Sequence, residues 1–330
     1  MAVSIADIQK LRKMTGAGLS DCKKALTDAE GNFEKAVEII REKGQAIAAK
    51  RSDRETSNGC VLVKYADGFG AIVALKCETD FVANGADYIK LTQDILDAAV
   101  AAKAKSLDEV KELALADGTK VQDAVVARSG ITGEKMELDG YNFIEGENVS
   151  TYDHMGKHTL CTMVQTNKAA EEQAHAIAMQ VAAMKPMFLD EASVSQEFID
   201  EEKKVAAEKT KQELVQKAVE AALKKAGINP AHVDSEEHME SNMGKGWITA
   251  EDVAKAKEII ATVSAEKAAN LPAPMIENIV KGRINRIFKE NCLLNQEFIQ
   301  DSKLSVSDYL KAADKELTVV DFKRFSLSAD

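Results

Sequence analysis

Residues that could carry out covalent chemistry are sparse in this sequence and match no familiar catalytic spacing. Five histidines occur among the 330 residues, and two of them, His154 and His158, share the segment HMGKH. A metal could bind this pair, but the segment coincides with an expected hairpin turn and lacks the carboxylates of a zinc motif. We therefore favour an exposed polar turn. The phosphate loops GxxxxGKS/T and GxGxxG and the nucleophile elbow GxSxG do not occur, so we expect no catalytic residue, no metal ligand and no cofactor.

The segment CETDFVANGADY, residues 77–88, has residues suited to binding another molecule and not to covalent catalysis. Here Asp80 and Phe81 stand side by side between a predicted strand and a predicted helix, where loops are normally small and polar. This position suggests contact with another molecule. On the residues alone two simpler interpretations remain open: Phe81 packs as a hydrophobic staple under the next helix, and Asp80 is an ordinary N-cap.

The second half of the chain offers an internal comparison for this segment. A hairpin at 149–166 and a helix at 169–184 can be overlaid on the first hairpin and helix, which predicts a weak internal duplication. In that overlay TDFVA, beginning at Thr79, is replaced by TNKAA, beginning at Thr166. The acid and the aromatic are missing from the second copy, so the fold of the repeat does not need them.

The elements around the segment are a hairpin and the helices that follow it. Two β-branched, apolar runs at 60–66 and 71–77 are joined by DGFG, a strong turn signal. A helix with Tyr88, Leu91 and Ile95 on one face comes next, followed by a helical stretch near 107–128. We expect residues 129–140 to be a loop.

Residues 4–44 predict a separate module of three short helices. The apolar residues recur at helical spacing, and TGAG at 15–18 separates the first two helices because glycine adopts backbone angles that other residues avoid. The third helix is expected to finish before Gly44. The polar, charged residues 48–59 show no periodicity and are interpreted as a linker.

The part of the chain beyond residue 185 predicts a helical excursion and a return to the core. Residues 196–226 and 249–269 are charged helical stretches, and the irregular residues 227–247 lie between them, which predicts an antiparallel helical hairpin. Residues 317–326 alternate between apolar and charged side chains, a pattern typical of a strand.

Composition restricts the class of partner. The net charge is −11, which argues against a general binder of nucleic acid or anionic membranes, since both need an excess of Lys and Arg. Residues 1–54 nevertheless hold eleven Lys or Arg against eight Asp or Glu. A weakly basic module on an acidic body suits docking to an acidic protein surface, although helical modules often lie a few charges from zero.

Cysteine usage and hydropathy indicate a reducing, aqueous compartment. The five cysteines are scattered and odd in number and have no CxxC spacing, so we expect thiols in the core, not disulfides or a zinc site. The first residues contain no apolar signal core, and no run of 18 apolar residues occurs. We expect a cytoplasmic protein.

Four segments, in this order, resemble bacterial elongation factor Ts: IQKLRKMTGAGLSDCKKAL (8–26), CETDFVA (77–83), MQVAAMKP (179–186) and KENCLLNQEFIQD (289–301). The resemblance covers about residues 1–210 and 266–326, and its first two motifs together are highly specific. It implies an α+β fold with a ubiquitin-associated-like three-helix module, a core of two related α+β subdomains and an inserted helical coiled-coil hairpin. The implied ranges are 1–54 for the module and its linker, 55–145 for the first core subdomain, 146–195 with 266–330 for the second, and 196–265 for the insertion.

The resemblance also implies a function without covalent chemistry. Members of this family are guanine-nucleotide exchange factors for elongation factor Tu, whose GTPase domain they contact through the TDFV motif, here Thr79, Asp80, Phe81 and Val82. The acid and the aromatic wedge between helices of that domain and disturb its magnesium site, so that GDP leaves and GTP is loaded. The N-terminal module docks on another face of the same domain, through the residues around Leu11, Arg12, Thr15, Gly16, Ala17 and Gly18.

Other partners and functions are weighed against this implication. A further domain of elongation factor Tu is an expected contact, a dimer of heterodimers is left open, and direct binding of nucleic acid or membrane is not expected. A ubiquitin-associated-like adaptor would fit residues 4–44 alone, but the core hairpins and TDFV argue against it. An enzyme with an unrecognised site is disfavoured by the missing motifs.

The sequence departs from the family pattern in two places. The stretch from 211 to 265, which includes Trp247, exceeds the length expected for the coiled-coil insertion of shorter members, and we expect a modest contribution to exchange from it. The C-terminal helical module of some longer members is not expected here, so contacts made by that module are not carried over.

Overall fold

The computed structural model describes residues 3–328 of the chain, which form an α+β fold in two compact units. The first unit comprises the residues up to Leu189 together with those from Glu297 onward, and the second is Asp190–Gln296. Each unit has its own packed interior and is described separately.

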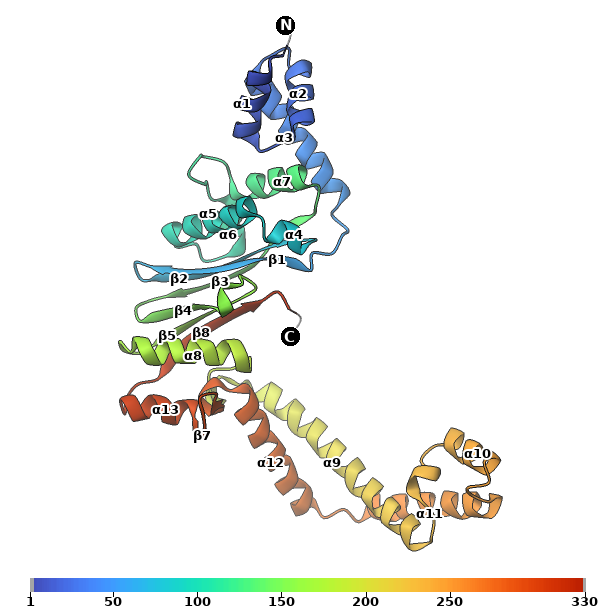
Figure 1. Cartoon of the computed structure of the whole chain (residues 1–330). Coiled ribbons are helices and arrows are strands. Elements are labelled where there is room, and N and C mark those ends of the chain that lie inside the picture. Colours follow the sequence, from blue (N-terminus) through green and yellow to red (C-terminus); the bar gives the residue numbers. More distant parts are fainter. Residues whose placement is uncertain (1–2, 329–330) are drawn as a thin grey trace. The chain divides into compact units, whose positions relative to one another are not determined.

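Three helices begin the first unit, as the sequence predicts: α1 (Ile5–Thr15), α2 (Leu19–Asp28) and α3 (Phe33–Lys50) (Figure 1). Leu11, Cys22 and Leu26 are fully buried between them. The TGAG turn works as expected at Gly16, which ends α1 in the left-handed conformation with φ 70°. The prediction for the third helix was wrong at its end, because α3 continues past Gly44 to Lys50 and takes up the start of the expected linker.

Gly44 continues the helix because another backbone lies against it. In α7 (Val121–Thr132), Gly130 faces Gly44 so closely that a Cβ on Gly130 would lie 2.4 Å from the Gly44 Cα. Two glycines thus let α3 and α7 cross in backbone contact. Arg41 and Asp123 form an ion pair of 2.7 Å between the same two helices. The N-terminal module is therefore packed against the core through α3, and Gly44 is a contact residue that the sequence presented as a helix terminator.

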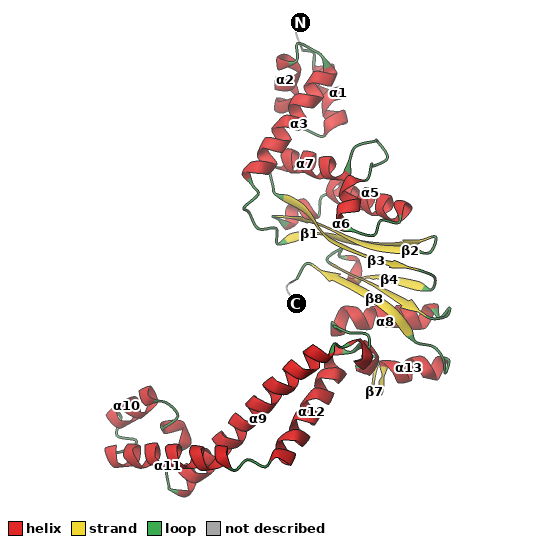
Figure 2. Cartoon of the chain, turned by 180° about the vertical axis from the view of Figure 1, so that it is seen from behind, coloured by secondary structure: helices red, strands yellow, loops and turns green. Residues whose placement is uncertain are grey.

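Two three-stranded antiparallel sheets face each other in the core of this unit (Figure 2). One has the order β1 (Asn58–Ala66), β2 (Phe69–Cys77), β3 (Met136–Glu145), and the other β4 (Val149–Asp153), β5 (Leu160–Thr166), β8 (Val319–Ser326). Buried side chains from both sheets, including Val61, Ile72 and Met163, form the layer between them. The Val61 N–H donates to the His158 carbonyl at 2.7 Å and links the two sheets at one edge.

Helices cover the outer faces of both sheets. The first sheet carries α5 (Ala86–Ala102), α6 (Leu107–Glu112) and α7, and the second carries α8 (Glu171–Met184) (Figure 1). The helical stretch expected near 107–128 is therefore two helices separated at 113–120. The unit ends with the short strands β6 (Glu297–Phe298) and β7 (Asp301–Ser305), helix α13 (Val306–Ala313) and β8.

Strand β3 overturns the expectation of a loop at 129–140. Its charged residues alternate with Met136 and Leu138, which pack into the core, and a register shift opposite Ala74/Leu75 interrupts the alternation. Gly140, which signalled a loop, is needed because Phe325 of the facing sheet lies there: a Cβ on Gly140 would come within 2.2 Å of its ring.

The two strand-to-helix connections differ, which refines the internal comparison. Thr79 lies beyond the end of β2 and is followed by the one-turn helix α4 (Asp80–Ala83), whereas Thr166 is still paired within β5. The overlay of these two threonines was therefore wrong. Residues 167–170 lead from β5 directly to α8, so this sheet and its helix are connected without any counterpart of α4.

The second unit is helical and wider than the 196–265 expected for the insertion. Helix α9 (Gln196–Lys225) packs against α11 (Ala250–Ala269) and α12 (Ala273–Asn291). The expectation of an irregular 227–247 was wrong, since α10 (Glu236–Gly244) lies within it. Leu223, Val233, Met239 and Ile248 form a small core there, formed by contacts between elements that no local periodicity reveals.

The cysteines agree with the sequence prediction, and the helices carry no membrane signal. All five thiols are free and buried, and burial raises the pKa of Cys60 to about 12. Within residues 3–328, no helix combines the length and apolar character that crossing a membrane requires.

We predict that Gly130→Ala destabilises the first unit by about 1–3 kcal/mol, because the added methyl group would overlap the Gly44 backbone. Urea unfolding followed by circular dichroism measures the loss. The control is Gly282→Ala in α12, where a Cβ meets no atom within 4 Å and the change should be neutral or slightly stabilising. Equal stability of the two variants would contradict the backbone contact.

Candidate functional site

The TDFV motif forms the start of α4, and its side chains point in two directions. Val82 and Ala83 pack against the core of the first sheet, whereas Phe81 is 87% exposed. The interpretation of Phe81 as a staple beneath the following helix was therefore wrong. The N-cap interpretation of Asp80 was wrong as well, because the capping residue is Thr79, whose side chain accepts from the Val82 N–H.

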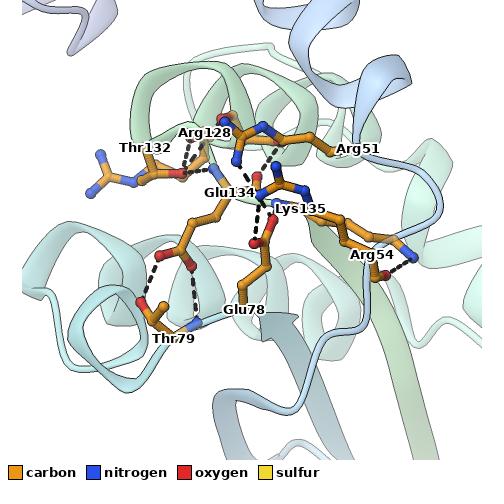
Figure 3. A network of polar contacts seen from close by, with 9 residues as sticks. Arg51, Arg54, Glu78, Thr79, Arg128, Thr132, Glu134 and Lys135 are labelled. Carbon is orange, nitrogen blue, oxygen red and sulfur yellow. Dashed lines mark hydrogen bonds and ion pairs between the residues drawn. The ribbon is translucent and has the colours of Figure 1, made fainter.

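Glu134 fixes the N-cap from the other side (Figure 3). Its carboxylate accepts the Thr79 backbone N–H at 3.1 Å and the Thr79 hydroxyl at 2.6 Å. Glu134 follows Gly133, the left-handed cap of α7, and its own carbonyl accepts the hydroxyl of the buried Ser129 at 2.5 Å. The short helix is thus tied to the end of α7.

Glu78 makes the matching contact from the other strand: it follows β2 and accepts an N–H group next to Glu134. Its carboxylate accepts the Lys135 backbone N–H at 2.6 Å and pairs with Arg54 at 3.0 Å and Arg51 at 3.7 Å (Figure 3). The Lys135 N–H contributes most to lowering the pKa of Glu78, and the two guanidinium groups act in the same direction. Since Arg51 caps α3, this cluster joins the N-terminal module to the base of α4.

These two carboxylates extend the pairing of β2 with β3. Cys77 and Met136 are the last Cα partners of the ladder. In the same register the next pairs are Glu78 opposite Lys135 and Thr79 opposite Glu134, where side-chain carboxylates take the N–H groups that strand carbonyls would otherwise accept. Sequence reasoning missed both glutamates. Glu78 follows the end of β2 and Glu134 precedes the start of β3, and only the pairing of the two strands brings each acid to the other strand.

Asp80 lies at a groove of about 260 Å³. The groove is lined also by Asn84, Lys157, His158 and Leu327, and so joins α4 to the turn after β4. In that turn, at 154–159, the His158 ring contacts the Asp153 carboxylate at 2.5 Å, as a polar turn would. Across residues 3–328, no group of three or more His, Cys, Asp or Glu side chains is arranged to hold a metal ion.

The residues expected to act in the N-terminal module divide into buried and exposed ones. Leu11 and Ala17 are buried in the core of the module. Arg12, Gly16 and Gly18 are exposed, and the Thr15 hydroxyl donates to the Leu11 carbonyl at 2.8 Å. Two exposed apolar side chains beside the turn were missed: Met14, 59% exposed, and Leu19, 49% exposed.

A groove of about 720 Å³ lies between this module and the outer helices of the first sheet. Met14, Thr15 and Ala17 line one side of it, and residues of α5 and α7, among them Leu91 and Ile131, line the other. The N-terminal residues and the helix that positions Glu134 thus border one groove, whereas Asp80 lines the smaller groove on α4.

Comparison with known proteins gives a consistent result. A family model described as elongation factor TS matches residues 78–229 and 216–329. Elongation factor Ts of Bacteroides fragilis is 69% identical, that of Bacteroides thetaiotaomicron 66% and that of Porphyromonas gingivalis 44%, each with full coverage of both chains. This is the family that the four quoted segments resemble.

We predict that Glu78→Gln lowers the free energy of unfolding at pH 7 by about 1 kcal/mol, since it removes a charge that accepts one N–H and pairs with two arginines. A carboxyl whose pKa is lowered on folding stabilises above its unfolded pKa, about 4.3, and this contribution is lost as the pH falls through the folded value. Urea unfolding at pH 7 and pH 3 should therefore show the variant and the wild type converging at the acid pH.

The control for this prediction is Glu55→Gln, which removes the same charge from an exposed side chain. It should leave unfolding unchanged at both pH values. A difference between Glu78→Gln and the wild type that persists at pH 3 would contradict the assignment.

Proposed function

Because the chain belongs to the elongation factor Ts family, we propose that it binds elongation factor Tu carrying GDP and accelerates release of the nucleotide, so that GTP can be loaded. It acts as an exchange factor through protein binding, with no covalent step. The coarse role follows from family membership. The assignment of residues to that role is our proposal.

The observation that carries the proposal is the exposure of Phe81. This aromatic side chain is 87% exposed, on a helix whose N-cap, Thr79, is hydrogen-bonded to Glu134. Covering an exposed aromatic side chain with a partner removes apolar surface from water, which is favourable, and aromatic residues are enriched at the centres of interfaces. Burial of a Phe side chain contributes roughly 1.5–3 kcal/mol. Asp80, exposed beside it, supplies a hydrogen-bond acceptor that sets the register of insertion.

Exchange follows from differential binding. A GTPase holds GDP through magnesium on the phosphates and through backbone donors of its phosphate loop. A factor that binds the nucleotide-free state more tightly than the GDP state weakens GDP binding by the same factor, because the coupling is reciprocal. Phe81 contributes part of that difference. Displacement of a helix that positions the magnesium contributes the rest.

The N-terminal module supplies a second contact with the same GTPase domain. The exposed Arg12, Met14 and Leu19 and the TGAG turn form its outer surface, next to the groove of about 720 Å³. We assign Leu11 and Ala17 an indirect part, since from the core of the module they hold this surface in shape. A further domain of elongation factor Tu is an additional proposed contact.

The remaining parts of the proposal concern organisation and location. From the family resemblance we propose 1–54 as the module with its linker, 55–145 as the first core subdomain, 146–195 with 266–330 as the second, and 196–265 as the insertion. This division differs from the two packed units, in which Asp190–Gln296 pack together. We also propose that the protein works in the cytoplasm, without direct contact to nucleic acid or membrane, for which a net charge of −11 is unsuited.

We predict that the protein accelerates release of fluorescent GDP from elongation factor Tu at fixed magnesium concentration. Stopped-flow fluorescence after mixing with excess unlabelled GDP gives the rate as a function of factor concentration. The acceleration should saturate, because release proceeds from a complex of the two proteins. Absence of acceleration at any concentration would refute the proposed function.

We further predict that Phe81→Ala slows the maximal release rate about ten- to hundredfold, the factor that corresponds to the burial energy of the side chain. Thermal unfolding should be unchanged, because Phe81 is exposed in the free protein. The control is Trp247→Ala, which removes an aromatic that is 62% exposed in the second unit and should change release less than twofold. A folded Phe81→Ala variant with the wild-type rate would remove the wedge from the mechanism.

A further inference from the structure

The N-cap of α4 lacks the local partner that other helices of this chain have. In a capping box, the N-cap side chain accepts an N–H of the first turn, and a carboxylate three residues later accepts the N-cap N–H. Three helices in the described part of the chain are closed in this way: Ser4 with Asp7, Thr249 with Asp252, and Ser305 with Asp308. In α4 the third position is Val82, which packs into the core and cannot accept a hydrogen bond.

Glu134 supplies the missing carboxylate from a different element. It accepts the Thr79 N–H at 3.1 Å, the contact that position 82 would make in a local box. It also accepts the Thr79 hydroxyl at 2.6 Å, which turns the hydroxyl hydrogen away from α4 and leaves the oxygen free to accept the Val82 N–H at 3.4 Å. Both halves of the cap therefore depend on one carboxylate at the end of α7.

The direction of α4 depends on this cap at its start and on the packing of Val82 and Ala83 at its end. The helix has four residues, too few for a helix to be stable by itself. Phe81 is exposed, so its direction follows that of the α4 backbone. Ala83 anchors the C-terminal end in the core, and Thr79 is the fixed point at the other end.

We propose that Glu134 is a positioning residue for nucleotide exchange: its bonds to Thr79 fix the start of α4 and so aim Asp80 and Phe81 at the partner. This inference rests on the proposed function and deepens it. Figure 3 shows the Glu134 carboxylate reaching the backbone and the hydroxyl of Thr79, the residue from which α4 begins.

The support for Glu134 is independent of α4. The Glu134 N–H donates to the Thr132 hydroxyl at 3.3 Å, its carbonyl accepts from Ser129, and Gly133 closes α7 just before it. Glu78 holds the next residue through the Lys135 N–H. These backbone contacts persist when the Glu134 side chain is shortened, so a variant should lose the clasp and keep the fold.

The test measures the maximal release rate and the half-saturating factor concentration separately. Glu134→Ala should lower the maximal rate of GDP release from elongation factor Tu about tenfold, since a wedge displaced by about an ångström acts poorly. Its thermal unfolding should stay close to that of the wild type. Glu134→Gln, which keeps an acceptor, should recover part of the rate. The control Asp308→Ala opens a capping box on α13 and should leave the rate unchanged.

A double variant separates positioning from general destabilisation. If Glu134 acts through Phe81, Phe81→Ala combined with Glu134→Ala should be hardly slower than Phe81→Ala alone. Rate losses that multiply in the double variant, or a wild-type maximal rate in Glu134→Ala, would overturn the positioning role. If Glu134→Ala does not fold, Thr79→Val replaces it. This change removes the two hydroxyl bonds, to Glu134 and from the Val82 N–H, and keeps the Thr79 N–H bond to Glu134. An unchanged rate in that variant overturns the role equally.

The experiment distinguishes failure of the proposed exchange function from failure of the positioning role of Glu134. A wild-type protein that does not accelerate release removes the proposed function and the positioning role with it. An active wild type with a slow Phe81→Ala variant and a fast Glu134→Ala variant leaves the proposed function intact and removes only the role of Glu134.

Discussion

The exchange of carboxylates beyond the last pair of β2 and β3 is the contact on which the arrangement of the site depends. Glu78 accepts the Lys135 N–H and Glu134 accepts the Thr79 N–H, so each strand end is closed by an acid from the other. Bonds from N–H groups to ionised carboxylates are stronger than those to carbonyls. The exchange also ends the sheet at a defined residue, and α4 begins from that point.

The same junction links the site to the N-terminal module. Arg51 and Arg54, at and beyond the end of α3, pair with Glu78, and Gly44 of α3 lies against Gly130 of α7. The backbone contact fixes how closely the helices approach, because neither glycine has a side chain to separate them. Both surfaces proposed to bind the partner are thereby held on one framework.

Because this framework holds α4, the fold does not need Phe81 in its core, and the side chain is free to contact a partner. Val82 and Ala83 hold α4 to the core, while the residue before them remains outside. The equivalent connection after β5 runs straight into α8 without such a helix. The sheet-and-helix arrangement therefore forms without the TDFV turn, so the residues of this turn can be used for binding.

Sequence reasoning was reliable where the determining interactions are local. Helical spacing, capping residues and turn glycines predicted the three N-terminal helices and the first hairpin, since these depend on neighbours within a few residues. The oddity of an aromatic beside an acid identified Asp80 and Phe81 as candidate contact residues, and the resemblance of four segments identified the family. The exposure of Phe81 was beyond reach, because a staple and a wedge have the same local sequence.

What only the tertiary structure decided comes from contacts between distant segments. The sequence predicted that Gly44 ends a helix and that Gly140 lies in a loop. Gly44 instead lies inside α3, where the backbone of α7 occupies the space of a side chain. Gly140 lies inside β3, where the Phe325 ring does so. Leu11 and Met14 share one apolar pattern, and packing alone placed the first inside and the second outside. Glu134 showed no signal at all: the residue it caps is 55 positions away, and only the register of β2 with β3 brings the two together.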